Sequence, residues 1–177
     1  MSQLIECVPN FSEGRDPAVI RLITDEIAAV EGVKLLNVDP GKATNRTVVT
    51  FVGAPAAVCE AAFRAIKKAG EVIDMSRHTG EHPRMGATDV CPLIPIAGIS
   101  MEETAEHAHR LAERVGRELS LPVYLYECAQ PNPARKNLSV IRVATTAKTH
   151  DGRLVCTFER MILVYGRGQG PYDAAGY

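Results

Sequence analysis

The order in which two kinds of apolar pattern follow one another is the strongest constraint on the fold of this chain. Six segments carry these patterns: 4–8, 17–31, 33–38, 46–52, 55–73 and 90–96. The first, third, fourth and sixth are short and apolar or β-branched, as in strands, whereas the second and fifth repeat apolar residues at helical spacing. The series strand, helix, strand, strand, helix, strand predicts an α+β fold with a ferredoxin-like βαββαβ core.

The order allows an antiparallel or a mixed sheet, of which we expect the mixed one, with both helices packed on one face. Asp16 followed by Pro17 is a start signal for the first helix. Asp39-Pro40-Gly41 predicts the turn between the second and third strands.

Beyond this core, the pattern predicts a further helix and further strands. Ser100 with Glu103 matches a capping box, and the helix that it begins runs to about Leu119. Strands are expected at 123–126, 139–143 and 154–165. Because 177 residues fill one core and no linker interrupts them, we expect a single domain over 1–177.

Charge and cysteine usage exclude several classes of protein. The net charge is -1, from 20 basic and 21 acidic residues, so no overall field attracts nucleic acid or an anionic membrane. No segment approaches the roughly 20 apolar residues of a membrane helix. The five cysteines are an odd number without a CxxC pair, which favours reduced thiols in a cytoplasmic protein over disulfides or structural zinc.

The densest polar stretch is 77–89, between the second helix and the fourth strand of the core. It contains two histidines, two arginines and two carboxylates. A histidine titrates in the range needed for proton transfer, and arginines hold anionic substrates, so His82, Arg77 and Arg84 are candidates for these roles. A solvated loop histidine without a role is the competing interpretation.

Two other polar loops, 9–15 and 39–46, are expected at neighbouring sheet ends. Asn10, Asn45 and Arg46 are their candidates for contact with substrate. If the three loops converge, Asp39 is placed to orient His82, as a carboxylate fixes the tautomer of a catalytic imidazole.

Two further features indicate no site. His78 and His82 have the spacing of helical metal ligands, but Gly80 and Pro83 are incompatible with a regular helix there, so we expect no metal. Cys91 lies in a predicted buried strand, where apolar surroundings make a packing role more probable than nucleophilic catalysis.

Four stretches carry a longer match: Ile5 to Gly14, Thr44 to Thr47, Pro122 to Tyr126, and Asp74 to Pro92 with its Glu81-His82-Pro83-Arg84-Met85-Gly86. Over roughly 2–142 the chain resembles the glutamate formiminotransferase family. The resemblance implies transfer of a formimino group from N-formiminoglutamate to tetrahydrofolate in histidine degradation. It further implies that His82 is the general base, and that Arg77 and Arg84 bind the carboxylates of the donor and of folate.

Members of the family have two α/β subdomains with folate bound between them, and in animals a cyclodeaminase domain follows. The resemblance covers only the first subdomain, and 144–177 does not match the family's continuation. It therefore implies a homodimer or a separate chain that supplies the second subdomain. Two alternatives stay open: a non-catalytic folate-binding or protein-interaction module, and a formyl rather than a formimino donor.

Overall fold

A computed structural model describes residues 2–81, 85–137, 142–148 and 154–161 of the chain. The chain divides into two compact units, residues 1–124 and 125–177, which we describe separately. The expectation of a single domain stays a prediction. In the described residues, no helix is long and apolar enough to cross a membrane.

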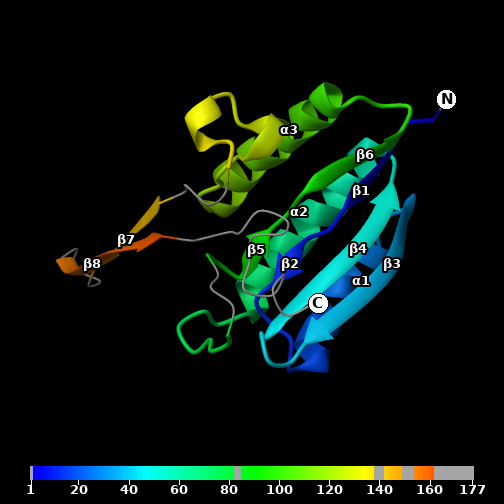
Figure 1. Cartoon of the computed structure of the whole chain (residues 1–177). Coiled ribbons are helices and arrows are strands. Elements are labelled where there is room, and N and C mark those ends of the chain that lie inside the picture. The colour runs from blue at the N-terminus through cyan, green and yellow to red at the C-terminus, as the bar shows by residue number, and fades with distance from the viewer. Residues whose placement is uncertain (1, 82–84, 138–141, 149–153, 162–177) are drawn as a thin grey trace, which may run out of the picture. The chain divides into compact units, whose positions relative to one another are not determined.

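The first unit contains the strands and helices of the predicted core (Figure 1). In chain order they are β1 Leu4–Cys7, β2 Asn10–Phe11, α1 Pro17–Ala28, β3 Val33–Gly41, β4 Arg46–Gly53, α2 Pro55–Val72, β5 Thr88–Val90, β6 Leu93–Ala97 and α3 Met101–Leu119. The α+β class is confirmed.

The strands form one sheet with the ferredoxin-like neighbour relations. β3 pairs with β4, β4 pairs with β1 and β2, and these pair with β6 and β5. Every strand pairing among the described residues of this sheet is antiparallel, so the sheet is antiparallel there rather than mixed as expected. The reason lies in the two connections that contain a helix, because each joins two strands that are not neighbours in the sheet. A third strand lies between the two and runs antiparallel to both.

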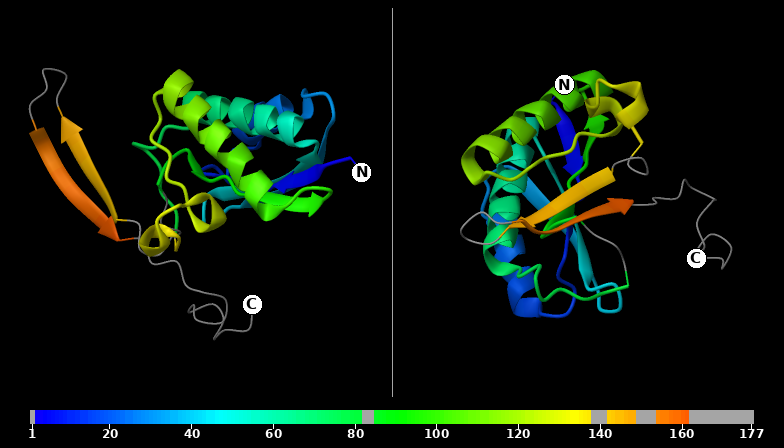
Figure 2. Two further views of the ribbon diagram at one scale, coloured as in Figure 1. Left: turned by 90° about the horizontal axis from the view of Figure 1, so that it is seen from above. Right: turned by 90° about the vertical axis from the view of Figure 1, so that its left-hand side faces the viewer.

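The helices lie on one side of this sheet, as predicted (Figures 1 and 2). α1 packs beside α2, and α3 packs against α2 and β6. Alternate residues of β4, among them Val49 and Phe51, are fully buried toward the helices. The intervening residues of β4 are only partly buried, which leaves a helix-free face on the other side of the sheet.

Two prolines divide the strands of the sheet. Pro92 lies between β5 and β6 and interrupts the strand predicted as continuous over 90–96. Pro9 ends the strand predicted over 4–8 and is followed by a short strand, β2, that the sequence does not predict. Proline has no N–H for the ladder, and the two interruptions lie together, with the N–H of Val8 donating to the carbonyl of Pro92 at 3.3 Å. The short β2–β5 pair therefore forms a separate ladder that leads into the polar loops.

The β3–β4 hairpin is confirmed, but its turn is not where the sequence predicts it. β3 continues through Asp39, Pro40 and Gly41, which pair with Val48, Thr47 and Arg46. An edge strand accommodates Pro40 because its missing N–H faces away from the ladder. The turn occupies 42–45 instead, and Asn45 takes the left-handed conformation with φ of 50°.

The predicted helix starts are confirmed. Asp16 caps α1, and Ser100 and Glu103 form the capping box of α3, with the Glu103 N–H donating to Ser100 Oγ at 3.1 Å. We expect Ser100→Ala to lower the free energy of unfolding by about 1 kcal/mol, because the Glu103 N–H in the first turn loses its side-chain acceptor. Urea denaturation measures this loss. Glu102→Gln in the same turn is the control, and an equal loss there would contradict the assignment.

The fifth strand predicted at 123–126 is wrong. The residues have strand-like composition, but they pair with no described strand, and Val123 and Tyr124 are exposed. The second unit contains two 3₁₀ turns, η1 Glu127–Ala129 and η2 Pro133–Arg135, and an antiparallel pair, β7 Arg142–Lys148 and β8 Leu154–Met161. This pair confirms part of the last two predicted strands, whose residues 139–141 and 162–165 lie outside the described residues.

Candidate functional site

The side chain of Asn45 joins the three polar loops. Its Oδ1 accepts a hydrogen bond from the N–H of Gly14 at 2.9 Å, and its Nδ2 donates to the carbonyl of Thr79 at 3.0 Å. Asn45 is 7% exposed, so these bonds are shielded from water. The predicted convergence of loops 9–15, 39–46 and 77–89 is therefore present.

Further bonds connect the same loops. Arg15 donates through Nε to the carbonyl of Lys42 at 3.0 Å and through a second guanidinium nitrogen to Thr79 Oγ1 at 3.4 Å. The Nε2 of His78 lies 3.1 Å from the carbonyl of Asn45. Because a carbonyl only accepts, this nitrogen carries the hydrogen.

Both flanks of residues 82–84 are attached to this cluster. Before them, the N–H of Glu81 donates to the carbonyl of Ala43 at 3.4 Å. After them, the N–H of Met85 donates to Asp89 Oδ1 at 2.9 Å, and Ser12 Oγ donates to the carbonyl of Gly86 at 2.6 Å. His82 and Arg84, the predicted base and one predicted anion binder, lie outside the described residues, but the chain on each side of them is fixed.

The other predicted residues are distributed around the loops. Arg46 lies 3.7 Å from Asp89 Oδ2 in an ion pair. Arg77 is 88% exposed and pairs with Asp74 at 3.4 Å. Asp39 is exposed on β3, and the register places it level with Val48 of β4 on the helix-free face of the sheet.

Asn10 occupies the same cross-strand row as Asp39. In the register, Asn10 pairs with Val48 of β4 and with Val90 of β5. It is 6% exposed, and its Nδ2 donates to the carbonyl of Val8 at 3.1 Å. The row Asp39, Val48, Asn10 and Val90 therefore crosses the sheet beside the loop cluster.

Sequence reasoning missed the residues that hold the cluster together. Ser12 and Asp89 form hydrogen bonds with the backbone of Gly86 and Met85, which follow residues 82–84. Thr79 accepts hydrogen bonds from Arg15 and Asn45, which belong to the two other loops. The available signal was their position inside the polar loops. Their partners are mostly backbone atoms far along the chain, which no local pattern reveals.

Asn45→Asp tests this framework. The carboxylate keeps an acceptor for the Gly14 N–H but loses the donor to Thr79, whose carbonyl it then faces. We expect a loss of about 1–2 kcal/mol in the free energy of unfolding. Urea denaturation at neutral pH measures it, with exposed Asn37→Asp on β3 as the matched control. Equal stability of the two variants would show that the bridge contributes nothing.

Two observations on the described residues concern metal ligands and thiols. Within the described ranges, no three His, Cys, Asp or Glu residues are grouped to hold a metal ion. The sulfurs of Cys7 and Cys91 lie 3.6 Å apart. Burial, followed by the neighbouring Cys91, raises the pKa of Cys7 well above its usual value, and burial raises the pKa of Cys59 to about 11. These two thiols stay protonated at neutral pH.

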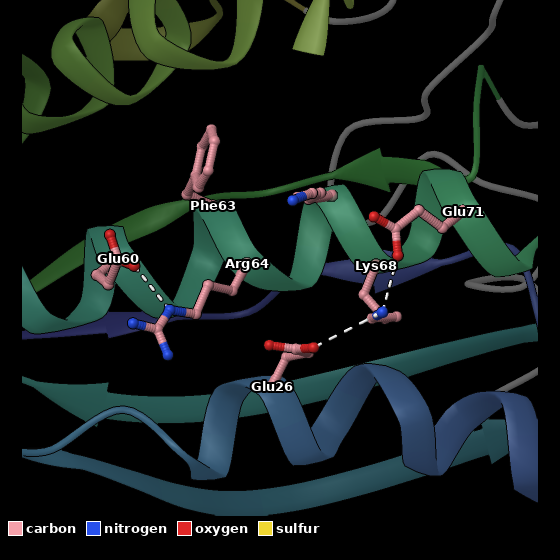
Figure 3. Close-up of a pocket in the computed structure, with 7 residues that line it drawn as sticks. Glu26, Glu60, Phe63, Arg64, Lys68 and Glu71 are labelled. Atoms are coloured by element: carbon pink, nitrogen blue, oxygen red, sulfur yellow. Dashed lines mark hydrogen bonds and ion pairs between the residues drawn. The ribbon is translucent and has the colours of Figure 1, made fainter. Parts of the chain in front are cut away.

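A hollow on the helices contains charges but none of the predicted site residues (Figure 3). It is lined by Glu26, Glu60, Phe63, Arg64, Lys67, Lys68 and Glu71. Glu60 pairs with Arg64 at 2.7 Å, and Lys68 pairs with Glu71 at 2.7 Å and with Glu26 at 3.7 Å. These ion pairs occupy most of the charges of the hollow, which favours a structural surface over a substrate site.

One of these carboxylates gives a pH prediction. Hydrogen bonds from Arg114 and then from Arg64 hold the pKa of Glu60 below its ordinary value. A carboxylate whose pKa is lower in the folded than in the unfolded state stabilises the fold. The stabilisation is complete at pH values above the unfolded-state pKa, and it is lost as the pH falls through the folded-state pKa. We therefore expect Glu60→Gln to be less stable than the wild type at pH 7, with a smaller difference at pH 3. Denaturation at both pH values measures it, and a constant difference would contradict it.

Comparison with known proteins gives an independent finding. The family model described as formiminotransferase domain, N-terminal subdomain, matches residues 4–153. Formimidoyltransferase-cyclodeaminase of Mus musculus is 54% identical over 142 residues, which cover 80% of this chain and 26% of the relative. Glutamate formimidoyltransferase of Streptococcus pyogenes serotype M1 is 46% identical over 80% of this chain and 48% of the relative. Glutamate formimidoyltransferase of Thermoplasma acidophilum is 50% identical over 78% of this chain and 46% of the relative.

The chain thus spans about a quarter of the length of the animal relative and about half of the microbial ones. The family match extends past position 142, to residue 153. It includes all three loops of the cluster and the sheet that carries them. The chain belongs to the formiminotransferase domain family, as an N-terminal subdomain.

Proposed function

We propose that this chain supplies the first half of the active site of a cytoplasmic glutamate formimidoyltransferase. The reaction is transfer of a formimino group from N-formimino-L-glutamate to tetrahydrofolate, in histidine degradation. The observation that carries the proposal is the bonding of the three loops through Asn45, because these loops contain the residues that resemble the family. A bonded cluster of this kind preorganises polar groups for substrate.

His82 is the proposed general base. The residues on either side of it in the sequence support this proposal, because the N–H of Glu81 donates to the carbonyl of Ala43 and the N–H of Met85 donates to Asp89, both within the loop cluster. Asp39, on the helix-free face next to the loops, is the proposed orienting carboxylate. Orientation by a carboxylate keeps the imidazole in the tautomer that accepts a proton.

The arginines are the proposed anion binders. The ion pair of Arg77 with Asp74 is exposed, so its exchange for a substrate carboxylate costs little. Arg84 is proposed for the same role, next to His82 in the sequence. Arg46, Asn10 and Asn45 complete the proposed contact set, although the amide of Asn45 already binds two backbone groups and acts mainly through the loops it joins.

Tetrahydrofolate is the proposed cosubstrate and provides the nitrogen that accepts the one-carbon group. The buried, unpaired Oδ1 of Asn10 fits a ligand that carries N–H groups, as both folate and the formimino donor do. A second subdomain, on the same protein or on a partner chain, is proposed to close the site. Closure excludes water and strengthens the electrostatic interactions inside.

Calorimetric titration of the chain with a reduced folate, with and without N-formimino-L-glutamate, tests the proposal. Saturable binding in the micromolar range is expected, and Asn45→Asp should weaken it while Asn37→Asp leaves it unchanged. Absence of binding to the chain, both alone and with an added second subdomain, would overturn the proposal.

A non-catalytic interaction module is the second candidate. The helix-free face of the sheet favours this candidate, because a sheet face that no helix covers is a surface on which a partner can pack (Figure 1). A module of this kind would cover that face by forming a homodimer. Light scattering at high concentration tests this candidate, and a monomer would count against it.

A further inference from the structure

Asn10 has a buried side-chain oxygen without a partner. Its Nδ2 donates to the carbonyl of Val8 at 3.1 Å, which fixes the orientation of the amide. The Oδ1 on the other side is buried, and within the described part of the chain it has no hydrogen-bond partner. Native proteins rarely leave such an acceptor unpaired, so this oxygen indicates a donor that the described part of the polypeptide does not supply.

A second unpaired atom lies on the neighbouring strand. Thr88 Oγ1 of β5 is also buried without a partner, and the register pairs Thr88 with Phe11, the residue after Asn10. Among the described residues, the two unpaired buried side-chain atoms thus come from one strand pair, β2–β5. This pair leads into loop 77–89, since the N–H of Ser12 donates to the carbonyl of Ala87 at 2.8 Å.

The chemistry of the atom restricts what it can bind. An amide oxygen accepts hydrogen bonds and donates none, so it needs an N–H or O–H. The hydroxyl of Thr88 both donates and accepts hydrogen bonds, so it does not distinguish a ligand that donates from one that accepts. The inference therefore rests on Asn10 alone.

We propose that Asn10 Oδ1 accepts a hydrogen bond from the terminal nitrogen of the formimino group and thereby selects a formimino over a formyl donor. The inference rests on the proposed function. N-formiminoglutamate and N-formylglutamate have the same shape and differ at one terminal atom, a nitrogen that bears hydrogen or an oxygen that bears none. A formyl oxygen would face the amide oxygen of Asn10, acceptor against acceptor, in a buried place. Sites built for a hydrogen bond reject analogues that cannot form it.

Binding of the two donors to the chain tests the inference. Calorimetry with N-formimino-L-glutamate and then N-formyl-L-glutamate gives their affinity ratio. We expect the wild type to favour the formimino compound by about tenfold or more. Asn10→Leu, which has similar size but no acceptor, should bring the ratio close to one. Asn10→Asp loses the Nδ2 bond to the Val8 carbonyl and with it some stability, but it keeps an acceptor and should retain the preference. Asn37→Leu, at an exposed position of β3, is the matched control and should bind as the wild type does.

The outcomes separate this inference from the proposed function. Equal affinity of the wild type for both compounds, or an unchanged ratio in Asn10→Leu, would overturn the inference and leave the proposed function standing. Loss of the preference in Asn10→Asp would also overturn it, and this variant decides the matter if Asn10→Leu does not fold. Binding of neither compound would overturn the proposed donor site on this chain, and the inference with it.

Discussion

His82→Ala is expected to lower kcat for formimino transfer by about 100- to 10,000-fold, the range that general acid–base catalysis contributes. The alanine cannot take the proton that the accepting nitrogen must lose. The loss should appear in kcat more than in KM, because the residues proposed to bind the carboxylates of the donor are unchanged in this variant. The assay uses the chain with a second subdomain added where transfer requires it.

His107→Ala is the control for this prediction. His107 lies on α3, outside the three loops, and its replacement should leave kcat unchanged. Circular dichroism of each variant confirms that the fold is retained. Unchanged transfer in His82→Ala, in a preparation in which the wild type is active, would refute the role of His82.

Gly14→Ala is expected to destabilise the fold by about 3 kcal/mol and to separate the loops, which makes it the second large effect. A Cβ on Gly14 would lie 2.5 Å from the backbone nitrogen of Arg46 and closer still to the carbonyl oxygen of Gly41. Both are backbone atoms, so no side-chain rotation relieves the clash. The Gly14 N–H would also lose its bond to Asn45, and folate binding should weaken with it.

Gly70→Ala is the matched control. Nothing lies within 4 Å of a Cβ at this exposed position of α2, so alanine there should stabilise the helix by about 0.5–1 kcal/mol. Urea denaturation of both variants gives the two changes, which should have opposite signs. A neutral Gly14→Ala would mean that the first two loops do not approach as closely as the structure has them.

The fold class and the convergence of the loops could be predicted because both follow from local signals. Asp16 and Ser100 begin helices through their own side chains, and alternation along β4 identifies its buried face. Once the strand order is known, antiparallel pairing brings the three polar loops to one end of the sheet. That placement needs the order and direction of the strands but not the side-chain contacts between the loops.

The errors came from features that depend on neighbouring strands. Asp39-Pro40-Gly41 has turn composition, but the ladder with β4 keeps it extended. Residues 123–126 have strand composition, and no described strand pairs with them. In both cases the pairing partner decides the structure, and local propensity is only a weak guide.

The individual roles of polar residues were equally hidden. Asn10 and Asn45 look alike in the sequence, as asparagines in polar loops. The structure separates them, because both ends of the Asn45 amide bind backbone groups whereas the Asn10 oxygen binds none of the described residues. Only the three-dimensional count of donors and acceptors distinguishes a residue that holds the framework from one that is available to a ligand.

The most direct test of the central claim is the set of backbone amide chemical shifts of the chain during titration with a reduced folate. The claim is that the loop cluster joined by Asn45 is the ligand site. It predicts that the shifts which change concentrate in 9–15, 41–47 and 77–90, while amides around the hollow on α2, such as those of Arg64 and Lys68, stay unchanged. Changes confined to α2, or none at all at saturating folate, would contradict it.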